Sequence, residues 1–287
     1  MNLTTEQKNE QWTSVIRPRS GWFDIDLRGL WSYRDLIMLF VRRDFVAIYK
    51  QTILGPLWFL LQPLFSTFVF TIIFGKIASI PTDGLPQVIF YMAGIITWNY
   101  FSTCLTTTSN TFTANSAIFG KVYFPRLAVP ISIVITNLIT FAIQFVLFLM
   151  FVFYFYIKGS SINPNLWILL TPLLLIQMAA LGLGFGILVS SMTTKYRDLV
   201  FVVSFGVQLW MYATPIVYPM SQIPVKWQPL YVLNPMVAVV EAFRYAFLGA
   251  GSILPWHLML SMCMTIVILV VGIIMFSRIE KTFMDTV

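Results

Sequence analysis

Charge is scarce in this chain. Asp, Glu, Lys and Arg make up only 10% of its 287 residues, whereas a soluble globular domain carries about 25%. Hydrophobic residues make up 58%, and the mean hydropathy is +0.82. No charge-rich block is long enough to form a soluble domain. The composition therefore predicts a single membrane domain.

Cysteine, histidine and acidic residues are too few for several classes of function. The two cysteines lie far apart in apolar stretches, which argues against a disulfide or a metal site. The eleven acidic residues do not cluster in any apolar stretch, and the one histidine, His257, stands at the edge of one. A membrane-embedded transferase usually needs clustered carboxylates, a metal or a His–Asp pair. We expect no catalytic residue, metal site or cofactor in this chain.

The chain also lacks the glycine-rich loop that binds nucleotide phosphates. Gly75-Lys76 and Gly120-Lys121 are followed by Ile and Val, where G-x-x-x-x-G-K-[ST] requires Ser or Thr. Gly182, Gly184 and Gly186 lie within an apolar stretch, where small residues allow helices to pack closely. An ATP-driven function would therefore need a separate ATPase.

Six apolar stretches are long enough to cross a membrane, since a helical span needs about 20 apolar residues. The sequence therefore predicts an all-α polytopic membrane protein. Its transmembrane domain covers residues 52–278, between a polar N-terminal tail at 1–20 with segment 21–51 and a C-terminal tail at 279–287. The six predicted transmembrane helices are 53–75, 85–112, 127–157, 166–192, 199–218 and 256–277.

Basic residues are distributed unequally between the two sides that these spans define. With the N-terminus in the cytosol, fourteen of the eighteen Lys and Arg residues fall on the cytosolic side. The other four are Lys76, Lys158, Lys226 and Arg244. This asymmetry follows the positive-inside rule. It predicts a multi-pass protein with both termini in the cytosol.

Segment 21–51 precedes the first span and is predicted to form an amphipathic helix at the inner membrane surface. At helical spacing Asp35, Arg42, Arg43 and Lys50 gather near one face, whereas Asp44 falls on the wrong side. Apolar surface is offered by Leu36, Leu39, Phe40 and Ile48. Two roles are open: an anchor for anionic lipid headgroups, or a platform for a partner protein. The charged residues of this interface helix are Arg34, Asp35, Arg42, Arg43 and Lys50.

The longest predicted outer connection is 219–254. Prolines interrupt its first half, and residues 236–248 are then predicted to form a short helix in which Glu241 and Arg244 can pair at i, i+3. The central parts of the six spans carry no ionisable residue. Because proton relays need such residues, a proton-coupled carrier is disfavoured, whereas a sodium-coupled one is disfavoured less strongly.

Aromatic residues make up 16% of the chain. Aromatic rings stack on the apolar faces of sugars, so rings along a channel would let a neutral glycan slide past. Packing and interfacial belts are the common alternative use of such residues. The candidate channel residues are Trp58, Phe65, Phe68, Trp98, Tyr100, Trp210, Tyr212 and Tyr218.

A short basic and aromatic loop separates the second and third spans on the cytosolic side. It closes segment 114–126 and reads Lys121, Val122, Tyr123, Phe124, Pro125, Arg126. Tyr123 and Phe124 would supply apolar anchors for a partner, Lys121 and Arg126 cationic rim contacts, and Pro125 a stiff backbone. A loop that only sets topology is the simpler alternative.

Taken together, these segments resemble the membrane subunit of polysaccharide ABC exporters, the ABC-2-type permeases of O-antigen and capsule export. The resemblance covers residues 20–280, although Ala242 and Tyr245 depart from the Gly and Trp of the family's Glu-Gly-Phe-Arg-Trp pattern. It rests on Tyr33-Arg34-Asp35-Leu36, Tyr49-Lys50-Gln51-Thr52 with Leu54-Gly55-Pro56-Leu57-Trp58, Lys121–Arg126, Tyr196-Arg197-Asp198-Leu199, Thr214-Pro215 with Val217-Tyr218-Pro219, and Leu233-Asn234-Pro235-Met236 with Glu241 through Gly249.

The resemblance implies a homodimer in the bacterial inner membrane, docked on two copies of a cytosolic ATPase that binds ATP and Mg. Loop 114–126 would couple to that ATPase, and segment 219–254 would form outer gate helices with Asn234, Pro235, Glu241 and Arg244. The implied substrate is a polyprenyl-pyrophosphate-linked polysaccharide. Membrane lipids are expected partners, and nucleic acid is not.

Other functions stay open at this point. A capsule or teichoic-acid exporter would share the architecture expected for an O-antigen exporter. A polyprenyl-linked sugar transferase would act without ATP or a partner. A lipid scramblase or secondary carrier would move its substrate with no ATPase present.

Overall fold

The computed structural model describes residues 27–286 except 51, 123, 197 and 252. The predicted tail at 1–20 and Tyr123 lie outside the described residues. The described part is helical and contains no strand. Its helices are α1 (Leu27–Ser32), α2 (Arg34–Lys50), η1 (Gly55–Leu57), α3 (Trp58–Phe70), η2 (Thr71–Ile77), α4 (Gln87–Ser109), α5 (Thr111–Phe119), α6 (Ala128–Ile157), η3 (Leu166–Leu170), α7 (Thr171–Thr193), α8 (Leu199–Tyr212), η4 (Met220–Gln222), α9 (Gln228–Val232), α10 (Pro235–Leu248) and α11 (Pro255–Thr286).

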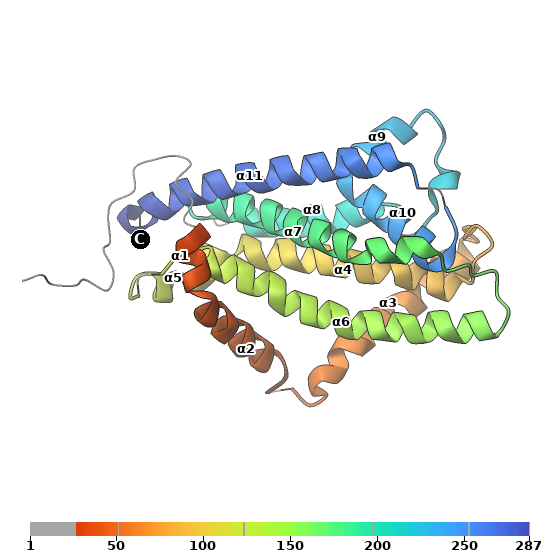
Figure 1. Ribbon diagram of the computed structural model, residues 1–287, viewed down its shortest axis with the longest axis horizontal. Helices are drawn as coiled ribbons and strands as arrows, with labels where there is room; N and C mark the ends of the chain where they lie inside the picture. The colour runs from red at the N-terminus through yellow and green to blue at the C-terminus, as the bar shows by residue number, and fades with distance from the viewer. Residues whose placement is uncertain (1–26, 51, 123, 197, 252, 287) are drawn as a thin grey trace, which may run out of the picture.

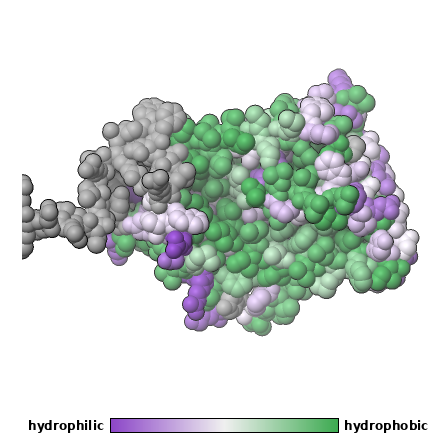
Figure 2. All heavy atoms as spheres, viewed as in Figure 1, coloured by the Kyte–Doolittle hydropathy of each residue, from purple (hydrophilic) through white to green (hydrophobic). Residues whose placement is uncertain are grey.

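The long helices run lengthwise through one bundle. α4, α6, α7 and α11 extend along its long axis, and α4 packs against both α6 and α7 (Figure 1). α1, α5 and the C-terminal end of α11 lie at one end, which we call the α5 end. α9 lies at the opposite end, the α9 end (Figure 1). Hydrophobic residues cover most of the surface between the two ends (Figure 2), as a membrane protein requires.

Five of the six predicted spans are confirmed as helices long and apolar enough to cross a membrane. The first runs through η1, α3 and η2, and the fourth through η3 and α7. The five are Gly55–Ile77, Gln87–Ser109, Ala128–Ile157, Leu166–Thr193 and Pro255–Ile279. The protein is therefore an all-α polytopic membrane protein.

The predicted span at 199–218 is corrected to a short helix followed by non-helical chain. α8 has 14 residues and ends at Tyr212, so it is about 21 Å long, whereas the hydrocarbon core is about 30 Å thick. Pro215 accounts for the early end, because proline lacks an N–H and disfavours a helical conformation at the residue before it. Residues 213–218 continue as turns and bends.

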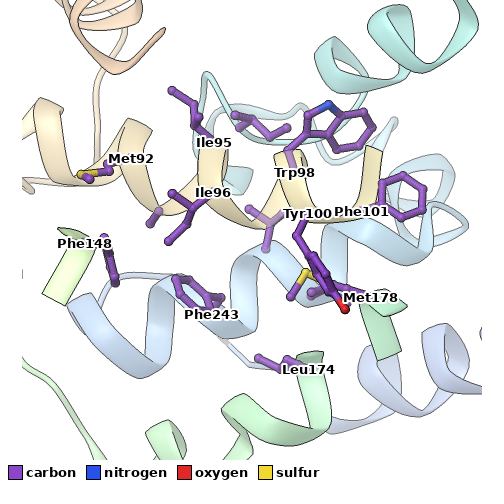
Figure 3. Packing of buried hydrophobic residues seen from close by; sticks show 14 of the residues in the cluster. Met92, Ile95, Ile96, Trp98, Tyr100, Phe101, Phe148, Leu174, Met178 and Phe243 are labelled. Atoms are coloured by element: carbon purple, nitrogen blue, oxygen red, sulfur yellow. The ribbon is translucent and has the colours of Figure 1, made fainter. Parts of the chain in front are cut away.

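α4 forms the centre of the bundle. It contacts α3, α6, α7, α8 and α10, and most of its residues are buried. Figure 3 shows its side chains packed against Phe148 of α6, Leu174 and Met178 of α7, and Phe243 of α10. The exposed residues of α4, Thr103 and Thr107, lie in its C-terminal half.

Glycines allow α7 to pack closely between two other helices. A Cβ atom on Gly182 would lie 2.7 Å from Cβ of Cys104, and one on Gly186 would lie 2.5 Å from Cβ of Thr108, so both face α4. Gly184 faces α11, where a Cβ atom would lie 2.9 Å from Cα of Leu269. The prediction that these three glycines serve helix packing is confirmed.

Replacing Gly184 by Ala should destabilise the protein. The new methyl group would meet the backbone of α11 at Leu269, which cannot rotate away, and overpacking of this kind costs about 1–3 kcal/mol. The melting temperature of the purified protein in detergent should fall by several degrees. Gly206→Ala on α8 is the matched control, because nothing lies within 4 Å of its added Cβ. An equal melting temperature for both variants would contradict this packing.

Candidate functional site

Aromatic rings join three helices at the α5 end. The ring of Phe124, just before α6, lies 5.7 Å from the ring of Phe40 on α2 and 5.7 Å from the ring of Phe119 on α5, centroid to centroid. Arg43 places its guanidinium carbon 4.7 Å from the Phe40 ring, and Arg126 lies 5.6 Å from the Phe119 ring. These cation–π contacts cover the rings with positive charge.

The predicted coupling loop divides into an exposed tip and a buried anchor. Lys121 is exposed and Val122 is 59% exposed. Both of their backbone N–H groups donate to the carbonyl of Ile118, which ends α5 in a tight turn. Phe124 is only 5% exposed, and Pro125 and Arg126 are half-buried. The loop therefore presents Lys121 and Val122 outward.

The role predicted for Phe124 as an anchor in a partner's groove does not fit this geometry. Its ring is enclosed by the protein's own Phe40 and Phe119, because the chain folds back from α5 into α6 at this point. Tyr123, the other predicted anchor, lies outside the described residues. Phe124 instead fastens the loop to α2.

α2 buries one side and exposes its charges. Ile37, Phe40 and Val41 are buried among residues of α5, α6, α7 and α11, and α2 packs along α6. Arg34, Asp35, Arg42, Arg43 and Lys50 are exposed or largely so. Met38 and Leu39 are also more than half exposed. The helix therefore carries both apolar and basic exposed surface, which suits a membrane interface.

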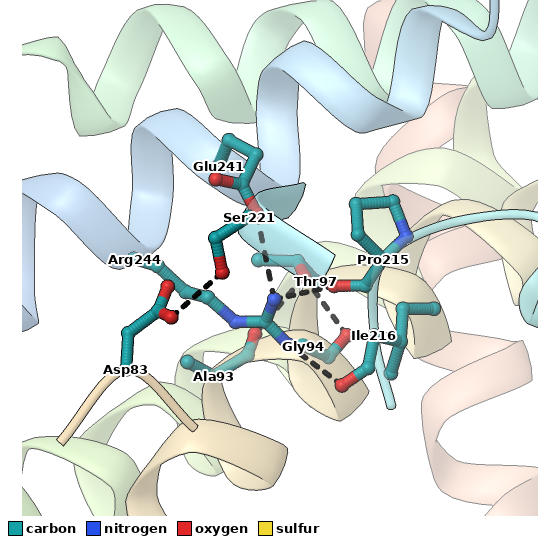
Figure 4. A network of polar contacts seen from close by, with 9 residues as sticks. All are labelled: Asp83, Ala93, Gly94, Thr97, Pro215, Ile216, Ser221, Glu241 and Arg244. Carbon is teal, nitrogen blue, oxygen red and sulfur yellow. Dashed lines mark hydrogen bonds and ion pairs between the residues drawn. The ribbon is translucent and has the colours of Figure 1, made fainter. Parts of the chain in front are cut away.

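A buried arginine organises the α9 end. Arg244 on α10 is 2% exposed, and its guanidinium donates to the backbone carbonyls of Pro215 and Ile216, the latter at 2.7 Å. Its Nη1 lies 3.6 Å from Oε1 of Glu241, so the predicted pair at i, i+3 is confirmed. The guanidinium carbon also lies 3.7 Å from the centroid of the Phe90 ring on α4. Figure 4 shows the contacts with Pro215, Ile216 and Glu241 converging on the guanidinium.

Local sequence fixes where α10 begins and ends. The side chain of Asn234 accepts from the N–H of Met236 at 3.1 Å, and Pro235 follows at the first helical position, which is a favoured helix start. Gly249 ends the helix with φ of +74°, a conformation that glycine adopts at little cost. Asn234 also donates to the carbonyl of Ala213 and to Oγ1 of Thr214. It thereby joins α10 to the chain after α8.

The ionisable groups at the α9 end affect one another's pKa values. Burial raises the pKa of the Glu241 carboxyl, while Arg244 opposes the shift and Asp83 adds to it. Burial lowers the pKa of Arg244 to about 10, and Glu241 opposes that shift. Arg244 therefore keeps its charge near neutral pH. Asp83 accepts a hydrogen bond from Oγ of Ser221 at 2.8 Å, which ties the loop before α4 to η4.

The predicted channel aromatics separate into two groups. Trp58, Phe65 and Phe68 on α3 and Tyr212 on α8 are exposed. Trp98 and Tyr100 are buried inside the core, where they cannot touch a glycan at a channel wall. Trp210 is half-buried against Trp98, and Tyr218 shares a 2.8 Å hydrogen bond with the hydroxyl of Tyr231.

Sequence reasoning missed two sets of residues. Phe201 and Phe205 are strongly exposed on α8. Their spacing of four residues, continued by Leu209 and Tyr212, could have predicted that they share one face of a helix. The carbonyls of Pro215 and Ile216 had no such signal, because backbone acceptors are not visible in residue types.

Comparison with known proteins places these features in a family. A family model described as ABC-2 type transporter matches residues 35–248. The chain belongs to the ABC-2 type transporter family. The matched region includes both the predicted coupling loop and the Arg244 network.

Two relatives show how far the similarity extends within the ABC-2 family. The O-antigen export system permease protein RfbA of Klebsiella pneumoniae is 27% identical over 252 residues, which cover 88% of this chain and 94% of the relative. The protein of the same name from Myxococcus xanthus is 28% identical over 226 residues, covering 77% of this chain and 83% of the relative. This ABC-2 protein is thus a transport permease similar to O-antigen export permeases.

Phe124→Ala should destabilise this ABC-2 permease. Removing the ring leaves a cavity between Phe40 and Phe119, and truncation of a buried Phe costs about 3–5 kcal/mol. The measurement is a thermal melt in detergent, with Val122→Ala as the exposed control. The interpretation of Phe124 as an internal anchor fails if the two variants melt at the same temperature.

Arg244→Ala should be among the most damaging substitutions in the chain. It leaves the carbonyls of Pro215 and Ile216 without their donors and Glu241 without its cation, and breaking a buried pair costs about 3–5 kcal/mol. Folded yield and melting temperature should both drop sharply. Lys226→Ala, at an exposed position of the same end, should leave them unchanged. Wild-type stability of the Arg244→Ala variant would show that the network is dispensable.

Proposed function

We propose that this permease is the transmembrane subunit of an ATP-driven exporter for a polyprenyl-pyrophosphate-linked polysaccharide of the O-antigen type. The observation that carries the proposal is the ABC-2 match across residues 35–248, together with relatives named as O-antigen export permeases. The same proposal places the chain in the bacterial inner membrane, with the α5 end in the cytosol.

The proposed assembly contains two copies of the permease and two copies of a separate ATPase, which binds ATP and Mg. Exposed rings on α3 and α8, including Phe65, Phe68, Phe201 and Phe205, are available to lipid, to a second copy or to the substrate at these faces. A glycan passing between two copies would meet such rings and stack on them. In this arrangement the channel lies between copies, not inside one chain.

Energy from the ATPase would enter at the exposed tip of loop 114–126. Val122 offers an apolar contact and Lys121 a cationic one, whereas Phe124 holds the tip against α2 and α5. A displacement of the tip would then move α2, α5 and α6 together, because packed rings transmit motion as a body. The basic face of α2, with Arg42, Arg43 and Lys50, would suit the pyrophosphate of the substrate or anionic headgroups.

Affinity purification of the tagged permease in mild detergent tests this proposal. The wild type should bring an ATPase with it. Val122→Asp should lower recovery of the ATPase at least about tenfold, as expected for the loss of a central interface residue, without changing the melting temperature.

Val225→Asp is the control, because Val225 is also exposed but lies in the connection between η4 and α9. It should retain the ATPase. Absence of any ATPase from the wild-type preparation would refute the proposed function. Full retention by Val122→Asp would refute only the assignment of the loop tip.

A further inference from the structure

A cavity of about 600 Å³ lies at the α9 end. It is bounded by α9, α10, the first turn of α11, η4 and Asp83 in the loop before α4. Its volume falls in the range of small-molecule sites, about 300–1,000 Å³. None of its lining residues belongs to α3 or α8. The cavity is therefore separate from the exposed aromatic faces that the proposed channel would use.

The polar groups of this cavity are mainly hydrogen-bond acceptors. Asp83 uses Oδ1 to accept from Ser221, and Glu241 uses Oε1 toward Arg244. Gln228 donates its amide N–H to the carbonyl of Ile223, which directs its own carbonyl oxygen elsewhere. Among the described residues, no hydrogen bond engages the second oxygen of either carboxylate or the side-chain oxygen of Gln228. A ligand that fits this cavity must supply hydrogen-bond donors.

Apolar side chains form the rest of the lining. Trp256 at the start of α11 is 55% exposed and contacts the ring of His257, with centroids 3.9 Å apart. Val225, Pro229 and Ile253 continue this wall. An aromatic ring beside an acceptor-rich floor suits a ligand with hydroxyl groups at its edge and C–H bonds on its face.

We propose that this cavity binds one or two sugar units of the exported glycan, as neutral six-membered rings. Sugar hydroxyls would donate to Asp83, Glu241 and Gln228, and the C–H face would pack on Trp256. The inference rests on the proposed function, because it takes the exported glycan as the source of the sugar. It adds a site on each permease outside the path between the two copies.

Other ligand classes fit less well. Two carboxylates facing the cavity would repel a phosphate or another anion. A long acyl chain would leave the buried Glu241 carboxylate and the Gln228 oxygen without donors. A metal ion lacks ligands here, since the described residues contain no group of three or more His, Cys, Asp or Glu side chains that could hold one.

Protection of a cysteine placed in the cavity tests the site directly. Val225 lines the cavity and is 79% exposed, so Val225→Cys should fold normally and react with a small thiol reagent. The variant is made in a Cys263→Ala background, because Cys263 is the exposed native cysteine whereas Cys104 is buried. Glucose, galactose, mannose and N-acetylglucosamine serve as probes of the purified permease without an ATPase.

At least one sugar should slow the reaction of Val225→Cys about threefold or more at concentrations up to about 100 mM, a weak affinity for a single sugar unit. Val122→Cys, at the opposite end, should be unaffected. Adding Trp256→Leu to the Val225→Cys variant should raise the sugar concentration that gives the same protection by roughly tenfold, as expected when a stacking contact is lost. Trp227→Leu is its control, because Trp227 is similarly exposed but does not line the cavity.

Three results would overturn the site: no protection by any of the four sugars, equal protection of Val122→Cys, or protection by ethanolamine in place of sugars. Each would leave the proposed function standing, because that function is tested by recovery of the ATPase. Conversely, sugar protection combined with no recovery of an ATPase in the affinity purification would keep the cavity and refute the exporter.

Discussion

The hydrogen bonds from Arg244 to the carbonyls of Pro215 and Ile216 are the interaction on which the rest of the α9 end depends. Inside a membrane protein, backbone that leaves a helix must find its partners within the protein, because lipid supplies none. The chain leaves the helix after Tyr212. Asn234 then donates to the carbonyl of Ala213 and to Oγ1 of Thr214, and Arg244 donates to the carbonyls of Pro215 and Ile216. These hydrogen bonds therefore fix the position of α10 against the chain that follows α8.

This requirement extends to α4. Gly94 lies beside the guanidinium, and a Cβ atom there would come within 2.8 Å of an Arg244 nitrogen. At the other end of α4, the carbonyl of Ser109 accepts from Thr193 of α7 at 3.1 Å. The next helix, α5, leads directly to the exposed loop tip. One buried helix thus joins the proposed entry point of ATPase motion to the charged network at the far end, and a close-packed core of this kind moves as a body.

Much of the fold was predictable because hydrophobic length and periodicity report burial in a membrane. The helices at 55–77, 87–109, 128–157, 166–193 and 255–279 appear where apolar stretches place them, and the glycines of α7 contact neighbouring helices as their spacing suggests. The helix predicted at 199–218 was too long, because hydropathy continues through Thr214-Pro215 while the helix ends at Tyr212. Glu241 and Arg244 were paired correctly from their spacing, since i, i+3 residues meet on any helix.

The site was less predictable because the type of a residue does not reveal which way its side chain points in the fold. Phe124 looked like a partner's anchor, yet the turn after α5 points it inward and leaves Val122 outside. Trp98 and Tyr100 looked like channel rings, yet both are buried where α4 packs against its neighbouring helices. The cavity beside Trp256 combines Asp83 with residues between Met220 and Leu258. No local pattern joins segments so distant in the chain.

The central claim is that this permease supplies a path across the membrane and that another protein supplies the energy. Its most direct measurement is transport of a lipid-linked glycan in vesicles reconstituted with the permease, with and without the ATPase that copurifies with it. The account predicts ATP-dependent movement of the glycan only when both proteins are present. Movement by the permease alone without ATP, or transfer of a sugar in place of its transport, would contradict it.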